Sequence, residues 1–266
     1  MKPDLDLDGN VVLVTGGSRG IGRGIATRFL VAGAEVVVCG RQPPETLPTA
    51  GGRSASFVAA DVRDLEQIER IVAAVLERHG RLDVLVNNAG GSPPADAATV
   101  SPRFSASIIQ LNLIAPLWLS QRANAVMQQQ PSGGSIVNIA SVSGVRPSPG
   151  TAAYGAAKAG LINLTQSLAV EWAPKVRVNA VVAGPIRTEQ AHLHYGSDAG
   201  IAAVDATIPL GRMGTPDDVA GACLFLASPL AAWVSGTALV VHGGGERPAF
   251  LDAAQVTTPR TRAGEP

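Results

Sequence analysis

A glycine-rich stretch near the start of the chain, residues 15–22, directly follows a continuously apolar run, residues 11–14, which is typical of a strand covered on both faces. In the segment after it, Ile21, Ile25 and Phe29 repeat every fourth residue, as along one face of a helix. Glycines permit a tight turn, and the start of a helix offers unpaired N–H groups to a phosphate. The stretch therefore predicts a dinucleotide-binding turn. The residues expected to contact the dinucleotide there are Gly16, Ser18, Arg19, Gly20, Ile21 and Gly22.

Apolar runs and helical segments alternate along the rest of the chain. Further strands are predicted at residues 36–38, 84–86, 136–139, 176–182 and 239–241. Helical periodicity lies between them, at about residues 65–75, 102–130, 152–172 and 215–227. Strands that alternate with helices build right-handed βαβ units. The predicted fold class is therefore α/β, a doubly wound parallel sheet of the Rossmann type, in a single three-layer α/β/α domain over residues 1–246.

The composition excludes several classes of protein. With 46% hydrophobic and 16% charged residues, the chain of 266 residues is not a disordered protein. A net charge of +0 argues against a nucleic-acid partner, and no apolar run approaches the roughly 18 residues of a membrane span. Two cysteines, Cys39 and Cys223, are too few for a disulfide framework, and residues 1–8 lack the apolar core of a signal peptide, so we expect a cytoplasmic protein. Residues 247–266 lack periodicity and predict a C-terminal tail, mobile unless it folds over an active site or a neighbouring subunit.

The end of the second predicted strand bears on the choice of cofactor. Enzymes that use NAD usually place an Asp or Glu here, where it binds the ribose hydroxyls of the adenosine. This chain reads Cys39-Gly40-Arg41 and has no carboxylate at the position. Because a guanidinium matches phosphate oxygens, Arg41 together with Arg19 favours the 2′-phosphate of NADP, with NAD as the second choice. The alternative is that both arginines are solvated.

Tyr154 and Lys158 are four residues apart in a segment predicted to be helical, which places both side chains on one face. Tyr154 is one of only two tyrosines in the chain. A phenol with a pKa near ~10 carries protons poorly at neutral pH, and an adjacent ammonium is expected to lower this pKa. Tyr154 would then give a proton to a carbonyl oxygen or take one from an alcohol. The alternative is a tyrosine that packs against the core beside a solvated lysine.

Four motifs follow one another along the chain: Thr-Gly-x-x-x-Gly-x-Gly at residues 15–22, Asn87-Asn88-Ala89-Gly90, Ser141, and Tyr154-x-x-x-Lys158. In this order and spacing the chain resembles the classical short-chain dehydrogenase/reductase family over about residues 10–245, and within it the 3-oxoacyl-thioester reductase-like branch. The resemblance implies that Ser141, in preference to Ser143, binds the substrate oxygen near Tyr154. It also implies that Lys158 binds the nicotinamide ribose, so that Tyr154 and Lys158 are both catalytic and cofactor-binding residues.

Asn112 lies inside a predicted helix, where asparagine has low propensity. Pro116, four residues on, has no N–H to give to the Asn112 carbonyl, so a water molecule bound there could pass protons toward Lys158. The resemblance agrees, because the family uses an asparagine in its proton relay. The alternative, compatible with the first, is a proline kink that Asn112 caps.

The resemblance implies further cofactor contacts on the adenosine side. Asn88, Ala89 and Gly90 would let the backbone pass close to the ribose. Asp61, followed by Val62, would bind adenine. From the residues alone, Asp61 could equally be the N-cap of the helix that begins near residue 65.

The segment after the strand predicted at residues 176–182 departs from the family's pattern. The usual Pro-Gly reads Ala183-Gly184 here, which relaxes the turn that orients the nicotinamide. Gly184, Ile186 and Thr188 are still expected to contact the cofactor, the last two at its carboxamide.

Residues 189–209 are predicted to form a lid over the substrate. Apolar residues in the lid, such as Ala191 and Ile201, favour a lipid-like or polycyclic substrate over a sugar. The His-x-His sequence at residues 192–194, with Asp198 nearby, could bind a metal. Solvated histidines are the favoured interpretation in such a loop, and no metal is expected.

These observations predict an oxidoreductase that transfers a hydride between NADP(H) and a carbonyl/secondary-alcohol pair. The expected catalytic residues are Asn112, Ser141, Tyr154 and Lys158. A 3-oxoacyl thioester or a similar apolar ketone is the favoured substrate, and a steroid-like or other ring ketone or alcohol is the alternative. Two other classes compete with this prediction. The intact Ser–Tyr–Lys set disfavours a non-catalytic NADP-binding sensor, and the absence of a second, substrate-binding domain disfavours an epimerase or dehydratase.

Association with copies of the same chain follows from the resemblance, which implies a homotetramer or homodimer. Small residues on the helix of Tyr154 would let another helix approach closely. They are Ala153, Ala156, Ala157 and Gly160. The same residues could instead serve packing within the chain. Apart from such copies we expect a small-molecule carbonyl or alcohol as partner, and neither nucleic acid nor membrane.

Overall fold

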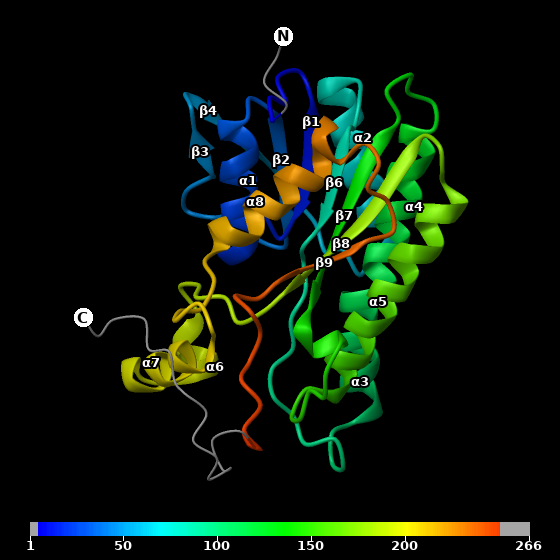
Figure 1. The fold of residues 1–266 in the computed structure, drawn as a ribbon. Helices are drawn as coiled ribbons and strands as arrows, with labels where there is room; N and C mark the ends of the chain where they lie inside the picture. The colour runs from blue at the N-terminus through cyan, green and yellow to red at the C-terminus, as the bar shows by residue number, and fades with distance from the viewer. Residues whose placement is uncertain (1–4, 251–266) are drawn as a thin grey trace, which may run out of the picture.

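Seven parallel strands form the sheet of the computed structural model, which describes residues 5–250 (Figure 1). Their spatial order is β5-β2-β1-β6-β7-β8-β9. The strands are β1 (Val11–Thr15), β2 (Glu35–Gly40), β5 (Ser56–Ala59), β6 (Val84–Asn87), β7 (Gly134–Ser141), β8 (Val176–Ala183) and β9 (Ala238–Val241). Along the chain, β2 and β5 are separated by two short strands, β3 (Thr49–Ala50) and β4 (Arg53–Ser54), which form a separate antiparallel pair. The order reverses between β1 and β6, so the predicted doubly wound α/β fold is confirmed.

Helices cover both faces of the sheet (Figure 1). They are α1 (Gly20–Val31), α2 (Leu65–His79), α3 (Pro102–Ile109), α4 (Ala115–Met127), α5 (Ala152–Glu171), α6 (Ala191–Tyr195), α7 (Asp198–Thr207) and α8 (Pro216–Ala227). Helices α1 and α8 pack on one face, and α2, α4 and α5 pack on the other. The short helices α6 and α7 lie apart from both layers, beyond the carboxyl edge of the sheet (Figure 1).

The core forms because β1 alternates its side chains between two apolar layers. Val12 and Val14 join the cluster under α1 and α8, whereas Val11 and Leu13 join the cluster under α2, α4 and α5. All four are buried, which explains why the strand reads as a continuous apolar run. The largest fully buried side chains include Phe29 of α1.

Local signals in the sequence fix the ends of the helices. The Asp64 side chain accepts hydrogen bonds from the backbone N–H groups of Glu66 and Gln67, so Asp64 is the N-cap of α2. The interpretation of Asp61 as this N-cap is therefore wrong. The first turn of α8 carries a reciprocal capping box between Thr215 and Asp218.

The helix predicted over residues 102–130 is divided into three parts. Between α3 and α4, residues Gln110–Ile114 form a π-helical turn, in which Ala115 N–H bonds the Gln110 carbonyl five residues back. Pro116 explains the change, since it cannot donate the hydrogen bond that a regular helix would need at this point. Such a turn widens the helix beside Asn112.

The remaining part of the chain leads from β9 back past the lid. The backbone N–H of Arg247 donates to the Thr207 carbonyl at 3.3 Å, so the start of the expected tail lies along the end of α7. Residues 251–266 of that tail lie outside the described residues. Within residues 5–250, no helix combines the length and the apolar character that a membrane span requires.

Candidate active site

The predicted site residues gather at the carboxyl edge of the sheet. Each group follows a different strand: the glycine turn follows β1, Arg41 follows β2, Asp61 follows β5, residues 88–90 follow β6, Ser141 ends β7, and residues 184–188 follow β8. Because the strands are parallel and adjacent, these segments meet at one edge although they are far apart in the sequence.

Thr15 connects the glycine turn to the end of β6. Its hydroxyl oxygen accepts hydrogen bonds from the backbone N–H groups of Asn88 and Ala89, both at 2.9 Å. The Asn88 side chain returns a bond from Nδ2 to the Thr15 carbonyl, also at 2.9 Å. The Asn-Ala-Gly motif thus holds the glycine turn in a fixed position, which is a structural role beside the cofactor contact predicted for it.

Two glycines of the turn are required by the close approach of backbone segments. A Cβ atom on Gly17 would lie 2.5 Å from a methyl group of Val38, and one on Gly22 would lie 2.2 Å from the Gly16 carbonyl oxygen. The turn is therefore packed too closely to admit side chains at these two positions, and this cradle of backbone leads directly into the first turn of α1. These residues fit a dinucleotide cofactor, whose pyrophosphate is recognised by such N–H groups.

An anionic group already lies at the start of α1. Gly20, the first residue of the helix, donates its N–H to the Glu189 carboxylate at 2.9 Å. Glu189 was missed in the sequence, because it lies 169 residues away and belongs to the start of the lid. The contact shows that this helix terminus accepts negative charge.

The adenosine side of the cleft contains Asp61 and two arginines. Arg63 binds the Asp61 carboxylate through two nitrogens, with 2.6 Å between Nη2 and Oδ2. These hydrogen bonds, with a smaller contribution from the charge of Arg41, lower the pKa of Asp61. Arg41 is exposed at the end of β2, and Val62 is buried. Arg63 was not singled out in the sequence, although its position two residues after Asp61 was a usable signal.

Ser141, Tyr154 and Lys158 form a connected group. The Ser141 and Tyr154 hydroxyls are hydrogen-bonded, and Ser141 Oγ also accepts from Ser143 N–H at 3.2 Å. Lys158 is 3% exposed, and its Nζ donates to the Ile139 carbonyl at 2.7 Å. The same nitrogen lies 5.6 Å from the centre of the Tyr154 ring. The helical spacing thus brings the two side chains together as predicted.

The pKa values differ from the expectation for Tyr154. Burial raises the pKa of the Tyr154 phenol, and only the hydrogen bond with Ser141 acts in the other direction. Burial also lowers the pKa of Lys158 to about 8, so its ammonium is easily lost. The predicted lowering by an adjacent ammonium is absent here because the Lys158 amine is directed to the Ile139 carbonyl and to the ring, and its own charge is disfavoured.

Asn112 is buried beside Lys158 with its side chain fully bonded. Its Oδ1 accepts from Gly91 N–H at 2.9 Å, and its Nδ2 donates to the carbonyls of Gly91 and Ile108. A Cβ atom on Gly90 would lie 2.6 Å from Asn112 Oδ1 and 3.3 Å from Lys158 Nζ. The structure therefore brings Asn112, Gly90 and Lys158 to one point.

The segment after β8 reaches the glycine turn from the other side. Gly184 N–H bonds the Val241 carbonyl at 2.9 Å, and Ile186 forms an isolated parallel bridge with Gly214. A Cβ atom on Gly20 would lie 3.6 Å from Thr188 Cγ2. The residues predicted to bind the carboxamide therefore lie next to the start of α1.

The lid presents part of the apolar surface that was expected of it. Leu193 is 77% exposed, whereas two other apolar residues of the lid are buried. Ala191 and Ile201 are 3% and 2% exposed and pack on Ile208 and Met213 in a small core of the lid itself. In this lid His192 Nε2 lies 4.0 Å from Asp198 Oδ1. Among the described residues, no three His, Cys, Asp or Glu side chains are grouped as a metal site would require.

Three polar residues to which no role was assigned from the sequence, Arg146, Tyr195 and Glu246, influence one another's charge. Arg146, five residues after Ser141, forms an ion pair with Glu246 across 100 residues. Burial raises the pKa of Tyr195, the charge of Glu246 raises this pKa further, and the charge of Arg146 lowers it. The charge of Tyr195 in turn raises the pKa of Tyr154. These influences connect Tyr154 electrostatically with Tyr195 and, through it, with the ion pair of Arg146 and Glu246.

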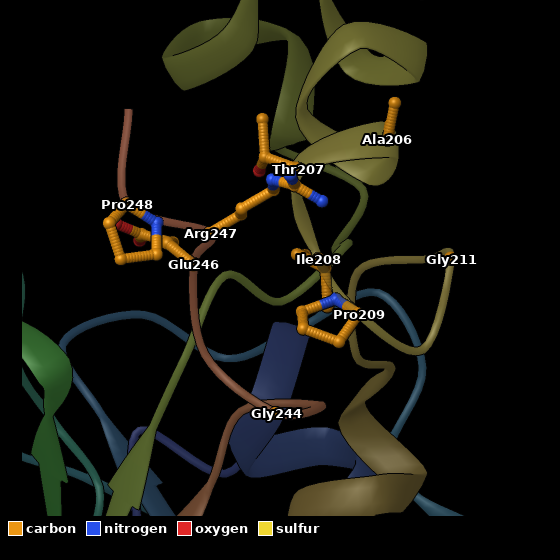
Figure 2. A pocket seen from close by; sticks show the side chains of 9 residues that line it. All are labelled: Ala206, Thr207, Ile208, Pro209, Gly211, Gly244, Glu246, Arg247 and Pro248. Carbon is orange, nitrogen blue, oxygen red and sulfur yellow. The ribbon is translucent and has the colours of Figure 1, made fainter. Parts of the chain in front are cut away.

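A pocket of about 560 Å³ lies between the end of α7 and the segment after β9 (Figure 2). Glu246, Arg247 and Pro248 line one side of it, and Figure 2 shows the Arg247 side chain extending toward Thr207. Neither Ser141, Tyr154 nor Lys158 lines this pocket, so it is distinct from the catalytic group.

Comparisons with known proteins agree with the geometry. The model of a family described as enoyl-(acyl carrier protein) reductase matches residues 16–246. A 3-oxoacyl-(acyl-carrier-protein) reductase of Chlamydia pneumoniae is 39% identical, over 91% of this chain and 98% of its own. An L-rhamnose 1-dehydrogenase (NAD(P)(+)) of Azotobacter vinelandii is 37% identical, over 88% of this chain and 95% of its own. A solved structure from Beutenbergia cavernae is described as an NAD(P)-dependent gluconate 5-dehydrogenase with NADP bound at low occupancy. It is similar to this chain with a TM-score of 0.84 at 38% identity, over 91% of this chain and 98% of its own.

Proposed function

Because the chain belongs to the short-chain dehydrogenase/reductase family of oxidoreductases, we propose that it transfers a hydride between NADP(H) and a carbonyl/secondary-alcohol pair. The observation that carries the proposal is the grouping of Ser141, Tyr154 and the buried Lys158 at the carboxyl edge of the sheet. The nicotinamide cofactor, when bound, supplies or accepts the hydride. The protein then has to hold the substrate oxygen and move its proton.

Tyr154 is the proposed acid at that oxygen. Burial raises its pKa, so the phenol holds the proton that a carbonyl under reduction needs, but the same rise makes it a weaker donor unless the phenolate is stabilised as it forms. Ser141, bonded to the same hydroxyl, would orient the substrate oxygen. Lys158 would bind the nicotinamide ribose and, as an ammonium, favour the phenolate that forms. Asn112 would anchor the proton relay through its backbone carbonyl, because its side chain is committed to Gly91 and Ile108.

The cradle before α1 supports the cofactor assignment. A carboxylate already bound at Gly20 N–H supports the binding of a pyrophosphate there, and Arg19, the N-cap of α1, makes no capping hydrogen bond with its side chain. Arg41 and Arg19 favour NADP over NAD, and a relative's structure contains NADP. The residues proposed to bind the cofactor are Gly16, Ser18, Arg19, Gly20, Ile21, Gly22, Arg41, Asp61, Val62, Asn88, Ala89, Gly90, Tyr154, Lys158, Gly184, Ile186 and Thr188.

For the substrate, a 3-oxoacyl thioester is the first candidate, supported by the relative from Chlamydia pneumoniae. A steroid-like or other ring ketone is a variant of the same apolar class. The lid gives this class partial support, because Leu193 is exposed whereas Ala191 and Ile201 face the interior of the lid.

A hydroxylated small molecule is the second candidate. Tyr195 acts electrostatically on Tyr154 and is itself influenced by the ion pair of Arg146 and Glu246; such polar groups suit a polyol or a sugar acid better than an acyl chain. Two of the relatives named above are described as dehydrogenases of sugars or sugar acids.

A spectrophotometric panel tests the proposal. Purified protein is mixed with NADPH or NADH and a 3-oxoacyl thioester, a steroid ketone or a keto sugar acid, and with NADP⁺ or NAD⁺ and the matching alcohols. The proposal expects turnover with at least one pair and a preference for NADP(H). Cofactor binding without turnover on the whole panel would favour a non-catalytic NADP sensor, and product formation without net redox change would favour an epimerase.

We also propose a homotetramer or homodimer, tested by native mass spectrometry. Ala156 is exposed on α5 and is free to meet another helix, whereas Ala157 is buried and Gly160 lies against Leu113 within the chain. Only part of the small-residue stretch therefore supports association.

A further inference from the structure

Glu189 lies at the junction of the cofactor cradle and the lid. It directly follows Thr188, and α6 begins two residues later at Ala191. Its Oε1 accepts the N–H of Gly20 at 2.9 Å. A Cβ atom on Gly20 would lie 4.0 Å from the same oxygen, so the start of the lid lies directly over the first turn of α1.

The electrostatics favour this contact. The first turn of α1 contains no acidic residue, and the Arg19 side chain makes no capping hydrogen bond. The partial positive charge of the helix terminus is thus left for a group from outside the helix. Among the described residues, Glu189 is the acidic side chain that bonds this terminus.

A pyrophosphate bound at the start of α1 would need the Gly20 N–H group that the Glu189 carboxylate occupies. Both are anions, so they also repel each other when they are close. From this we infer that Glu189 is an internal competitor of the cofactor: it must leave the start of α1 before the pyrophosphate binds, and its departure frees the start of the lid. The inference rests on the proposed function only in that the cradle binds a dinucleotide.

Two variants test the inference by binding, without turnover. Glu189→Gln keeps a carbonyl oxygen that can accept from Gly20 but removes the charge, and Glu189→Ala removes both. We expect the Kd for NADP⁺, measured by calorimetry, to fall by about twofold to fivefold for Glu189→Gln and by about tenfold for Glu189→Ala. Glu77→Gln is the matched control, because it removes one charge from an exposed site of α2 and should leave the Kd unchanged.

A second ligand separates the pyrophosphate from the rest of the cofactor. Adenosine 2′-monophosphate has the adenosine and the 2′-phosphate but no pyrophosphate, so its Kd, measured by competition with NADPH fluorescence, should be equal in all four proteins. Thermal melting of each variant checks that it is folded.

The outcomes are distinct. Unchanged or weaker NADP⁺ binding in folded Glu189→Ala would overturn the inference, as would an equal gain for adenosine 2′-monophosphate, which would indicate a general charge effect. If the wild-type protein binds neither NADP⁺ nor NAD⁺, the proposed function itself fails.

Discussion

Gly90 lies where Asn112 and Lys158 approach each other, and the substitution Gly90→Ala adds a methyl group at this point. The new Cβ atom would lie 2.6 Å from Asn112 Oδ1 and 3.3 Å from Lys158 Nζ. A carbon atom cannot stay 2.6 Å from an amide oxygen, so the Asn112 side chain has to move. It then loses up to three hydrogen bonds, two with Gly91 and one with Ile108.

The magnitude follows from these bonds. Each contributes about 0.5–1.5 kcal/mol, so the loss of all three should lower the free energy of unfolding by about 1.5–4.5 kcal/mol. For a domain of this size, the melting temperature should then fall by about 3–18 °C. Because Lys158 is pushed by the same methyl group, we expect kcat to fall by about a hundredfold.

The matched control is Gly221→Ala in α8. Nothing lies within 4 Å of a Cβ atom on Gly221, which is exposed, so the change should raise the unfolding free energy by about 0.5–1 kcal/mol and leave kcat unchanged. Urea unfolding and steady-state rates of both variants are the measurements. If Gly90→Ala melts and turns over like the wild type, the view that this glycine makes room for Asn112 and Lys158 is wrong.

Three further predictions concern titration, specificity and thiol reactivity. Burial lowers the pKa of Lys158 to about 8 from an ordinary value of 10.5, so between these pH values the unfolded chain binds more protons than the folded one. The stability of the wild type relative to Lys158→Met, measured by urea unfolding, should therefore rise as the pH increases from 8 to 10.5. A constant difference would speak against a buried amine. Arg41→Asp should lower the ratio of kcat/KM for NADP(H) over NAD(H) by about tenfold or more, and an unchanged ratio would make Arg41 a bystander. Burial raises the pKa of the Cys39 thiol to about 12 and also raises the pKa of the Cys223 thiol. Neither thiol should therefore react with Ellman's reagent at about pH 8 until guanidinium unfolds the protein. Rapid labelling of the native protein would contradict their burial.

The sheet and the proximity of Tyr154 and Lys158 could be predicted because their signals are local. The run Val11–Val14 is apolar since both faces of β1 are covered, and the spacing of Tyr154 and Lys158 places them on one face of α5. The glycine turn is likewise encoded where it acts, since Gly17 and Gly22 are each required by a neighbouring backbone or side chain.

The parts that could not be predicted depend on contacts between distant segments or between competing neighbours. Glu189 bonds Gly20 across 169 residues, and no sequence pattern near either residue predicts this contact. Asp61 and Asp64 both precede α2, but the helix begins at Leu65, so Asp64 is the N-cap and the Asp61 side chain binds Arg63 instead.

Burial decides two further properties that the sequence did not predict correctly. The pKa of Tyr154 rises because the phenol is desolvated, whereas the sequence indicated only its charged neighbour. Ile201 faces the interior of the lid, although its apolar character was equally compatible with a surface toward the substrate. The charged neighbour of Tyr154 does not reveal that burial raises its pKa, and the apolar character of Ile201 does not reveal which way its side chain faces.

The central claim is that the Tyr154 hydroxyl moves the proton of the reaction, and Tyr154→Phe tests it most directly. This change removes one oxygen atom from a residue whose ring stays in place. With a substrate from the panel, kcat should fall by about a thousandfold, whereas the Kd for NADPH, from quenching of its fluorescence, should stay within about twofold of the wild type. A variant that binds NADPH and still turns over at a rate near that of the wild type would contradict the account.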